Sequence, residues 1–297
     1  MTESEPRSTL LVTGGGGFIA TALIRGFAAR GWHTAGCGRH RPASFPEGSQ
    51  WRSYDLTWTS LPDELFDGVD VLVHAALVKE NVDVNLAGGT LLLETAQRRG
   101  VKDIVFISSL AAHPQARSQY GRQKYALERL FESHGALVVR PGLVLGDGGL
   151  FASMCAYLRR HPFVPLIDGG IQPLQTVFVD DLVDAMYQAV LRNLHGTYTV
   201  AEREPVLYRE FYRALCARLE ADVAFIPIPF WAADLAVQTA GLVHAGLPID
   251  HDNLLGLKAM QVDYGPRLEP REGPVPDYRE NIARAVPAPV GRHKLPG

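Results

Sequence analysis

TGGGGFIA, residues 13–20, joins an apolar run at residues 10–13 to a segment of helical spacing at residues 18–30. Glycines in such a loop permit a tight turn and let backbone N–H groups approach a pyrophosphate, and the helix N-terminus supplies partial positive charge to the same anion. The spacing fits GxGxxA in one register and TGxxGxxA in another. A strand, a glycine loop and a helix in this order predict a dinucleotide-binding loop. The residues expected to hold the cofactor there are Gly14, Gly16, Gly17, Phe18 and Ile19.

Outward from this loop, the first half of the chain alternates short β-rich runs with helical runs. Strands are predicted at residues 10–13, 33–38, 69–75, 103–108 and 137–140. Helices are predicted at residues 18–30, 84–99 and 120–132. This alternation is typical of the α/β class, with a doubly wound parallel sheet of the Rossmann type.

The second half of the chain is less regular. After Gly146 the alternation loosens, and prolines cluster between residues 162 and 173. Further helices are predicted at residues 180–194, 208–219 and 231–244. We therefore expect a cofactor-binding Rossmann domain at residues 1–149, to which residues 177–200 return, and a smaller, mostly helical substrate-covering region at residues 150–297. The tail after Val286 is expected to be disordered.

Composition excludes several classes of protein. The chain has 297 residues, 46% of them hydrophobic, which is enough to bury a full core without disulfides or a metal site. The net charge of −3 and the dispersed basic residues argue against a nucleic-acid partner. The three cysteines form no CxxC, so we expect reduced thiols and a cytoplasmic location. The apolar run at residues 223–249 is interrupted by prolines and by Asp234, so no transmembrane segment is predicted.

The end of the second predicted strand indicates which dinucleotide is bound. NAD is usually held by an Asp or Glu about 20 residues beyond the glycine loop. The stretch CGRHR, residues 37–41, offers no acid there, and an arginine can pair with the 2′-phosphate of NADP. NADP(H) is therefore the expected cofactor, held by Arg39 and secondarily by Arg41. Two alternatives stay open: NAD as the cofactor, and surface arginines without a ligand.

Tyr120 and Lys124 form a Tyr-x-x-x-Lys motif on a predicted helix. Residues i and i+4 share one helix face, so the phenol and the ammonium are expected to point into one site. The lysine charge is expected to lower the pKa of the phenol, which could then donate a proton to a carbonyl oxygen or accept one from an alcohol. Ser109, at the end of a buried strand, is expected to polarise the same oxygen. The alternative is a pair on a helix surface.

Taken together, these motifs resemble those of extended short-chain dehydrogenases/reductases of the NAD(P)-dependent epimerase/dehydratase superfamily. The segments that carry the resemblance are TGGGGFIA, Asp55-Leu56, His74-Ala75-Ala76, Asn85 with Gly89-Thr90, Ser109 with Tyr-x-x-x-Lys, Arg140-Pro141-Gly142 and Val179-Asp180-Asp181. The resemblance implies that Tyr120 and Lys124 also contact the cofactor, and that Asn85 supports the active site through water or backbone contacts. The other implied cofactor residues are Asp55 and Leu56 at the adenine end, Ala75 and Ala76 beside the dinucleotide, and Pro141 and Leu143 at the nicotinamide.

Two spacings depart from the sugar-nucleotide epimerases of that family: Ser109 to Tyr120 and His74 to Asn85 are both short. These spacings, with GGIQPLQTVFVDD and GLPIDHDNLLGL, resemble the atypical branch that includes the NADP-binding accessory subunit of respiratory complex I. The expected function is an NADP(H)-dependent oxidoreductase that acts on a carbonyl or secondary alcohol of a small-molecule substrate. The alternatives are an NADPH-binding sensor or assembly protein without turnover, and an NAD(P)-dependent epimerase or dehydratase. A homodimer stays open.

Overall fold

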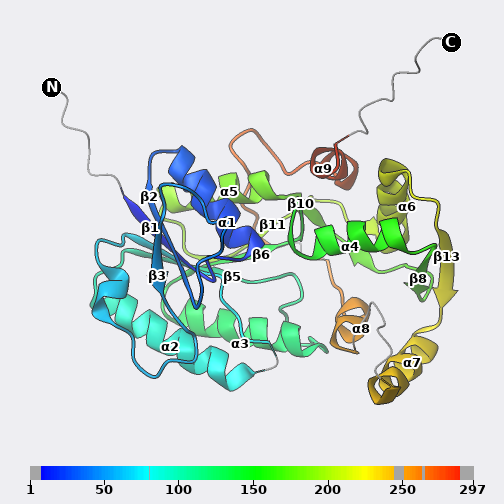
Figure 1. Ribbon diagram of the computed structural model, residues 1–297, viewed down its shortest axis with the longest axis horizontal. Helices are drawn as coiled ribbons and strands as arrows, with labels where there is room; N and C mark the ends of the chain where they lie inside the picture. The colour runs from blue at the N-terminus through cyan, green and yellow to red at the C-terminus, as the bar shows by residue number, and fades with distance from the viewer. Residues whose placement is uncertain (1–7, 80, 244–250, 263–264, 288–297) are drawn as a thin grey trace, which may run out of the picture.

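The computed structural model describes residues 8–79, 81–243, 251–262 and 265–287. Its main body is a seven-stranded parallel sheet in the order β11-β6-β5-β4-β1-β2-β3 (Figure 1). The strands are β1 (Thr9–Thr13), β2 (His33–Gly38), β3 (Gln50–Ser53), β4 (Val71–His74), β5 (Asp103–Ile107), β6 (Leu137–Pro141) and β11 (Gly196–Val200). Their parallel pairing brings the carboxyl ends of all seven to one edge of the sheet, where doubly wound folds bind ligands.

Helices cover both faces of this sheet. The helices are α1 (Phe18–Ala29) and α5 (Val179–Leu191) on one face, and α2 (Val82–Arg98) and α3 (Gln119–Ser133) on the other (Figure 1). In β1, Leu10 and Val12 pack on the first side, and Leu11 packs on the second. Because side chains alternate along a strand, both faces need apolar residues, which explains the nearly continuous apolar runs in the sequence. The predicted α/β class with a doubly wound parallel sheet is confirmed.

The remaining elements build a smaller region beside the sheet (Figure 1). Its helices are α4 (Gly149–Arg160), α6 (Tyr208–Leu219), α7 (Phe230–Val243), α8 (His251–Lys258) and α9 (Tyr278–Ala285). Its strand pairs are β7 (Leu143–Leu145) with β10 (Thr176–Phe178), β8 (Phe163–Ile167) with β13 (Ala224–Ile228), and β9 (Pro173–Leu174) with β12 (Val206–Leu207). A separate core joins α4, α6 and α9. A short 3₁₀ helix, η1 (Asp63–Phe66), precedes β4 in the main body.

Several sequence predictions fall on residues that the structure does not describe. These are the N-terminal residues 1–7, the first five residues of GLPIDHDNLLGL, His244 at the end of a predicted helix, and residues 288–297 of the tail. Among the described helices, none has both the length and the apolar character to span a bilayer.

Candidate active site

The glycine loop makes a turn that only glycine accommodates at its first position. Gly14 has φ +66°, a region that side chains disfavour, and a Cβ there would lie 3.0 Å from the backbone nitrogen of Ala76. The Gly17 N–H donates to the Gly14 carbonyl at 2.8 Å, which closes the turn. The loop is therefore tight and lies directly against the end of β4.

The N-terminus of α1 is open to an anion. Gly17 is the N-cap residue and has no side chain to cap the helix, and residues 18–21 include no acid. The first N–H groups of a helix have no acceptor within it, so they attract negative charge. Gly16 and Gly17 are exposed, and Phe18 and Ile19 are half-buried. The loop thus fits the pyrophosphate of a dinucleotide.

The Phe18 side chain turns away from the loop and packs on a second glycine turn. A Cβ at Gly146 or Gly148 would lie 2.6 or 2.5 Å from the Phe18 ring. These glycines therefore make room for the ring at the start of α4, and what Phe18 can offer a cofactor is its backbone N–H.

The two arginines expected to recognise NADP lie in the exposed loop after β2. The Arg41 guanidinium lies 5.4 Å from the ring centroid of Phe45, and Arg39 is close enough to Asp55 to help lower the pKa of that carboxyl. The largest cause of that lowering is a hydrogen bond from the Thr57 backbone N–H. The same loop touches the glycine loop, since a Cβ on Gly16 would lie 2.8 Å from Pro42 Cγ. The loop therefore carries positive charge beside the predicted dinucleotide site.

Thr13 and His74 tie the ends of β1 and β4 together. The backbone N–H groups of Ala75 and Ala76 both donate to the Thr13 hydroxyl oxygen at 3.2 Å. The Thr13 hydroxyl and His74 Nδ1 share a hydrogen bond of 2.8 Å. His74 is fully buried, and burial lowers its pKa to about 3. Its ring is therefore a neutral structural group that sets the positions of Ala75 and Ala76.

Asn85 organises the loop that follows β4. Its Oδ1 accepts from the Val78 N–H at 2.9 Å, and its Nδ2 donates to the carbonyls of Val78 and Asn81 at 2.7 Å each. Asn85 is 1% exposed, and these contacts are all to backbone, so its observed role is to position a loop. Leu56 is also a core residue, because its side chain packs beside Gly88 of α2.

Ser109 and Tyr120 come together at the carboxyl end of β5. A hydrogen bond with the Ser109 side chain lowers the pKa of Tyr120, but burial of the phenol raises it by more, and the net shift is upward. The Tyr120 residue as a whole is 41% exposed to solvent. The predicted lowering of the Tyr120 pKa is wrong in this structure, and the position of Lys124 supplies the reason.

Lys124 lies beneath Tyr120 and is directed toward the sheet. Its Nζ donates to the Ile107 carbonyl at 2.6 Å and lies 6.0 Å from the centroid of the Tyr120 ring. The side chain is buried, and burial lowers the pKa of Lys124 to about 8, against the opposing effect of the Glu128 carboxylate. The ammonium is therefore bound to β5 rather than to the phenol.

Glu128, which is not among the residues predicted from the sequence, anchors the middle of α3 to the ends of β5 and β6. Its carboxylate accepts from the Ser108 hydroxyl and from both Nε and Nη2 of Arg140. The available sequence signal is the spacing, since Tyr120, Lys124 and Glu128 recur every four residues and share one helix face.

Pro141 and Leu143 lie where the chain leaves the main sheet. Pro141 is buried at the end of β6, and the Leu143 N–H donates to the Gln175 carbonyl at 2.9 Å. Gly142 permits this crossing, because a Cβ there would lie 2.5 Å from the same carbonyl oxygen. Leu143 is half-buried, so it remains partly available to a ligand.

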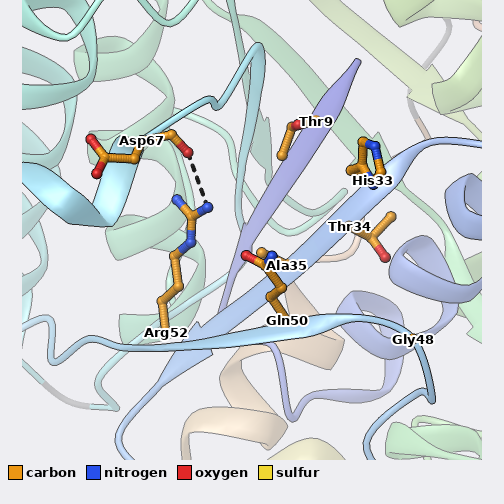
Figure 2. Close-up of a pocket in the computed structure, with 8 residues that line it drawn as sticks. All are labelled: Thr9, His33, Thr34, Ala35, Gly48, Gln50, Arg52 and Asp67. Carbon is orange, nitrogen blue, oxygen red and sulfur yellow. Dashed lines mark hydrogen bonds between the residues drawn. The ribbon is translucent and has the colours of Figure 1, made fainter. Parts of the chain in front are cut away.

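A cavity of about 280 Å³ opens at the opposite edge of the sheet, near the amino ends of β1, β2 and β3. Figure 2 shows its lining residues, which are Thr9, His33, Thr34, Ala35, Gly48, Gln50, Arg52 and Asp67. The Arg52 guanidinium donates to the carbonyls of Leu65 at 2.7 Å and Asp67 at 3.0 Å. The predicted site residues are absent from this cavity, so it is separate from the candidate active site.

The fold and the candidate site at the carboxyl ends of the strands define a nucleotide-binding α/β protein of the extended dehydrogenase/reductase type. Residues 10–201 match the model of the NAD dependent epimerase/dehydratase family. The chain belongs to that family.

Known relatives include different enzymes. The chain is 25% identical over 260 residues to a ceramide reductase of Caulobacter vibrioides, covering 80% of this chain and 78% of that protein. It is 23% identical over 269 residues to a UDP-glucose 4-epimerase of Vibrio cholerae, covering 77% and 81%. The solved UDP-glucose 4-epimerase of Thermus thermophilus in complex with NAD has a TM-score of 0.61 and 24% identity, covering 74% of this chain and 86% of that one.

Proposed function

We propose that this protein is an NADP(H)-dependent oxidoreductase that reduces a carbonyl group or oxidises a secondary alcohol of a small molecule. The observation that carries the proposal is the pairing of the Ser109 and Tyr120 side chains above the buried Lys124. They lie at the carboxyl end of β5, the same edge of the sheet as the glycine loop. A proton donor beside a dinucleotide loop is what carbonyl reduction requires.

Each residue has a defined task in this proposal. Tyr120 donates its phenolic proton to the carbonyl oxygen during reduction and takes it back during oxidation. Ser109 donates a hydrogen bond to the same oxygen and orients it, and Lys124 supplies positive charge below the phenol. A bound nicotinamide would supply or accept the hydride. Burial raises the pKa of Tyr120, so the phenol carries its proton at neutral pH, which is the form that a proton donor to a carbonyl oxygen needs.

The cofactor would be held by the glycine loop and by the loop after β2. The backbone N–H groups at residues 14–19 would bind the pyrophosphate, and Arg39, with Arg41 second, would bind the 2′-phosphate of NADP. Asp55, Ala75 and Ala76 would line the dinucleotide. Each of these residues follows the carboxyl end of one of the strands β1 to β4, and this position supports its assignment to the cofactor site.

The relatives support two candidate reactions. A ceramide reductase among them favours net reduction, and a UDP-glucose 4-epimerase favours an epimerase or dehydratase reaction, in which hydride returns to the substrate. Net reduction therefore predicts stoichiometric consumption of NADPH.

A cytoplasmic location is part of the proposal. Its reducing conditions suit Cys37, Cys155 and Cys216, which are buried and form no disulfide.

The test compares Tyr120→Phe with Tyr125→Phe, which removes a phenolic hydroxyl from the same helix. Purified protein is incubated with NADPH and panels of ketones, aldehydes and keto-lipids, and the loss of NADPH absorbance is measured. We expect Tyr120→Phe to lower the rate by roughly 10²–10⁴-fold with little change in NADPH affinity, and Tyr125→Phe to retain the rate. Full activity in Tyr120→Phe would exclude this mechanism. In parallel incubations of sugar nucleotides with NAD+ or NADP+, conversion without net change in the cofactor would establish the epimerase or dehydratase reaction. Tight NADPH binding without turnover of any substrate would establish the sensor.

A further inference from the structure

Helix α8 lies beside the amino end of α3, the helix that carries Tyr120 (Figure 1). The half-buried carboxylate of Asp252 joins them: Oδ1 accepts from the Gln119 N–H, and Oδ2 accepts from the Tyr120 N–H at 3.1 Å. Asp252 therefore caps the helix at the backbone of the candidate catalytic tyrosine itself.

A second contact lies at the other end of α8. His113, in the loop between Ser109 and Tyr120, donates from Nε2 to the Ala259 carbonyl at 3.1 Å, because a carbonyl can only accept. Between these two contacts, Gly256 lies against Ser118, where a Cβ would lie 3.6 Å from the Ser118 side chain. Helix α8 thus follows the loop that joins the two candidate active-site hydroxyls.

The Asp252 carboxylate supplies hydrogen-bond acceptors that the first turn of α3 lacks. The first N–H groups of a helix have no acceptor within it, and the Ser118 hydroxyl oxygen takes the one from Gly121 at 3.1 Å. Gln119 and Tyr120 obtain their acceptors from Asp252, whose negative charge also interacts favourably with the helix dipole. Without this carboxylate, the N–H groups of Gln119 and Tyr120 would lose these acceptors.

We propose that Asp252 is a positioning residue, which holds the backbone of Tyr120 so that the phenol meets Ser109. The C-terminal region that would cover the substrate thereby controls the geometry of the acid. This inference rests on the proposed function only for its effect on turnover. The placement of the phenol can be measured in the free protein.

The experiment uses the full chain, three variants at aspartates, and Tyr120→Phe for signal assignment. Asp252→Ala removes both acceptors, Asp252→Asn retains one, and Asp222→Ala removes an exposed acid elsewhere in the same region as a control. Protein carrying tyrosine labelled with carbon-13 at Cζ is studied by NMR, and the Tyr120 signal is identified by its loss in Tyr120→Phe. Amide exchange of residues 118–124, NADPH affinity, kcat and KM are measured in parallel.

We expect Asp252→Ala to shift the Tyr120 signal and to speed amide exchange at residues 119 and 120 at least tenfold. It should lower kcat by roughly 10–100-fold, since small misplacements cost rates of that order, while NADPH affinity changes by less than about twofold. Asp252→Asn should recover part of each effect, and Asp222→Ala should match wild type.

An unchanged Tyr120 signal or unchanged exchange in Asp252→Ala would overturn the proposal. So would a shifted signal with unchanged kcat on an identified substrate. If wild type turns over no substrate, the proposed function fails, and the NMR and exchange results alone decide whether Asp252 places Tyr120.

Discussion

The carboxylate of Glu128 and the guanidinium of Arg140 form a two-point ion pair, with Nε 2.8 Å from Oε1 and Nη2 2.6 Å from Oε2. Glu128 is almost fully buried, and the Arg140 side chain is 23% exposed. The pair joins α3 to β6 one helical turn beyond Lys124. Its carboxylate also opposes the lowering of the Lys124 pKa by burial, so it helps to keep the ammonium charged.

Glu128→Gln should therefore destabilise the fold and lower the pKa of Lys124. The substitution removes the charged partner from a largely buried two-point ion pair, so we expect a loss of about 3 kcal/mol in urea unfolding. The pKa of Lys124 should fall below its present value of about 8, which the pH dependence of NADPH-linked turnover would report. Arg129→Gln breaks the exposed pair with Glu132 on the same helix and should cost less than about 1 kcal/mol. Equal losses in the two variants would contradict this account.

Gly14→Ala and Gly31→Ala separate backbone strain from steric conflict. Both glycines have positive φ, so alanine at either position should cost about 1 kcal/mol. At Gly14 the new Cβ also meets the Ala76 backbone, and at Gly31 nothing lies within 4 Å. We expect a total loss of about 3 kcal/mol in Gly14→Ala, with at least tenfold weaker NADPH binding by fluorescence titration. Gly31→Ala should bind NADPH as wild type does. Unimpaired binding in Gly14→Ala would show that the loop is only a turn.

Arg39→Ala should reduce a preference for NADPH over NADH. A charge-assisted hydrogen bond to a phosphate contributes about 1.5–3 kcal/mol, which corresponds to roughly 10–100-fold in the ratio of dissociation constants. The ratio is obtained by titrating both cofactors into each protein. Arg213→Ala, which removes an exposed arginine from α6, should leave the ratio unchanged. Wild-type protein that binds both cofactors equally would refute the assignment of Arg39.

Glu202 should make stability depend on pH. Its buried carboxyl accepts from the Thr176 N–H and hydroxyl and from the Tyr278 N–H, which attaches α9 to the sheet. Burial nevertheless raises its pKa to about 7, above an ordinary value of 4.5. Because the folded pKa is the higher one, the contribution is fully present below about pH 4.5 and is lost as the pH rises through 7.

The measurement is the free energy of unfolding of wild type minus that of Glu202→Gln, by urea titration at pH 4.5 and pH 8. We expect this difference to be larger at pH 4.5, by up to roughly 3 kcal/mol. Glu210→Gln, at an exposed position of α6, should give a difference that is constant within about 0.5 kcal/mol. A constant difference for Glu202→Gln as well would show that its hydrogen bonds cancel the effect of burial, and a larger difference at pH 8 would show that they outweigh it.

The strands missing from the sequence analysis of the main sheet share a position. β3 and β11 form its two edges, whereas the five strands between them are all predicted. An edge strand buries less of its surface than a central one, so its apolar signal is weaker. Gln50–Ser53 has only one apolar residue, and Gly196–Val200 begins with an exposed glycine. β11 also pairs with β6, a strand that lies far from it along the chain, whereas β3 pairs with the strand just before it, β2.

The sequence by itself determined the local half of the site. A glycine run between strand and helix, and tyrosine and lysine one helical turn apart, are patterns whose geometry follows from short-range backbone rules. Only the tertiary structure decided how these groups behave. Lys124 binds the Ile107 carbonyl, burial raises the pKa of Tyr120, and Asp252 reaches its backbone from 132 residues away. Desolvation and long-range hydrogen bonds depend on what packs around a group, and spacing along the chain does not contain that information.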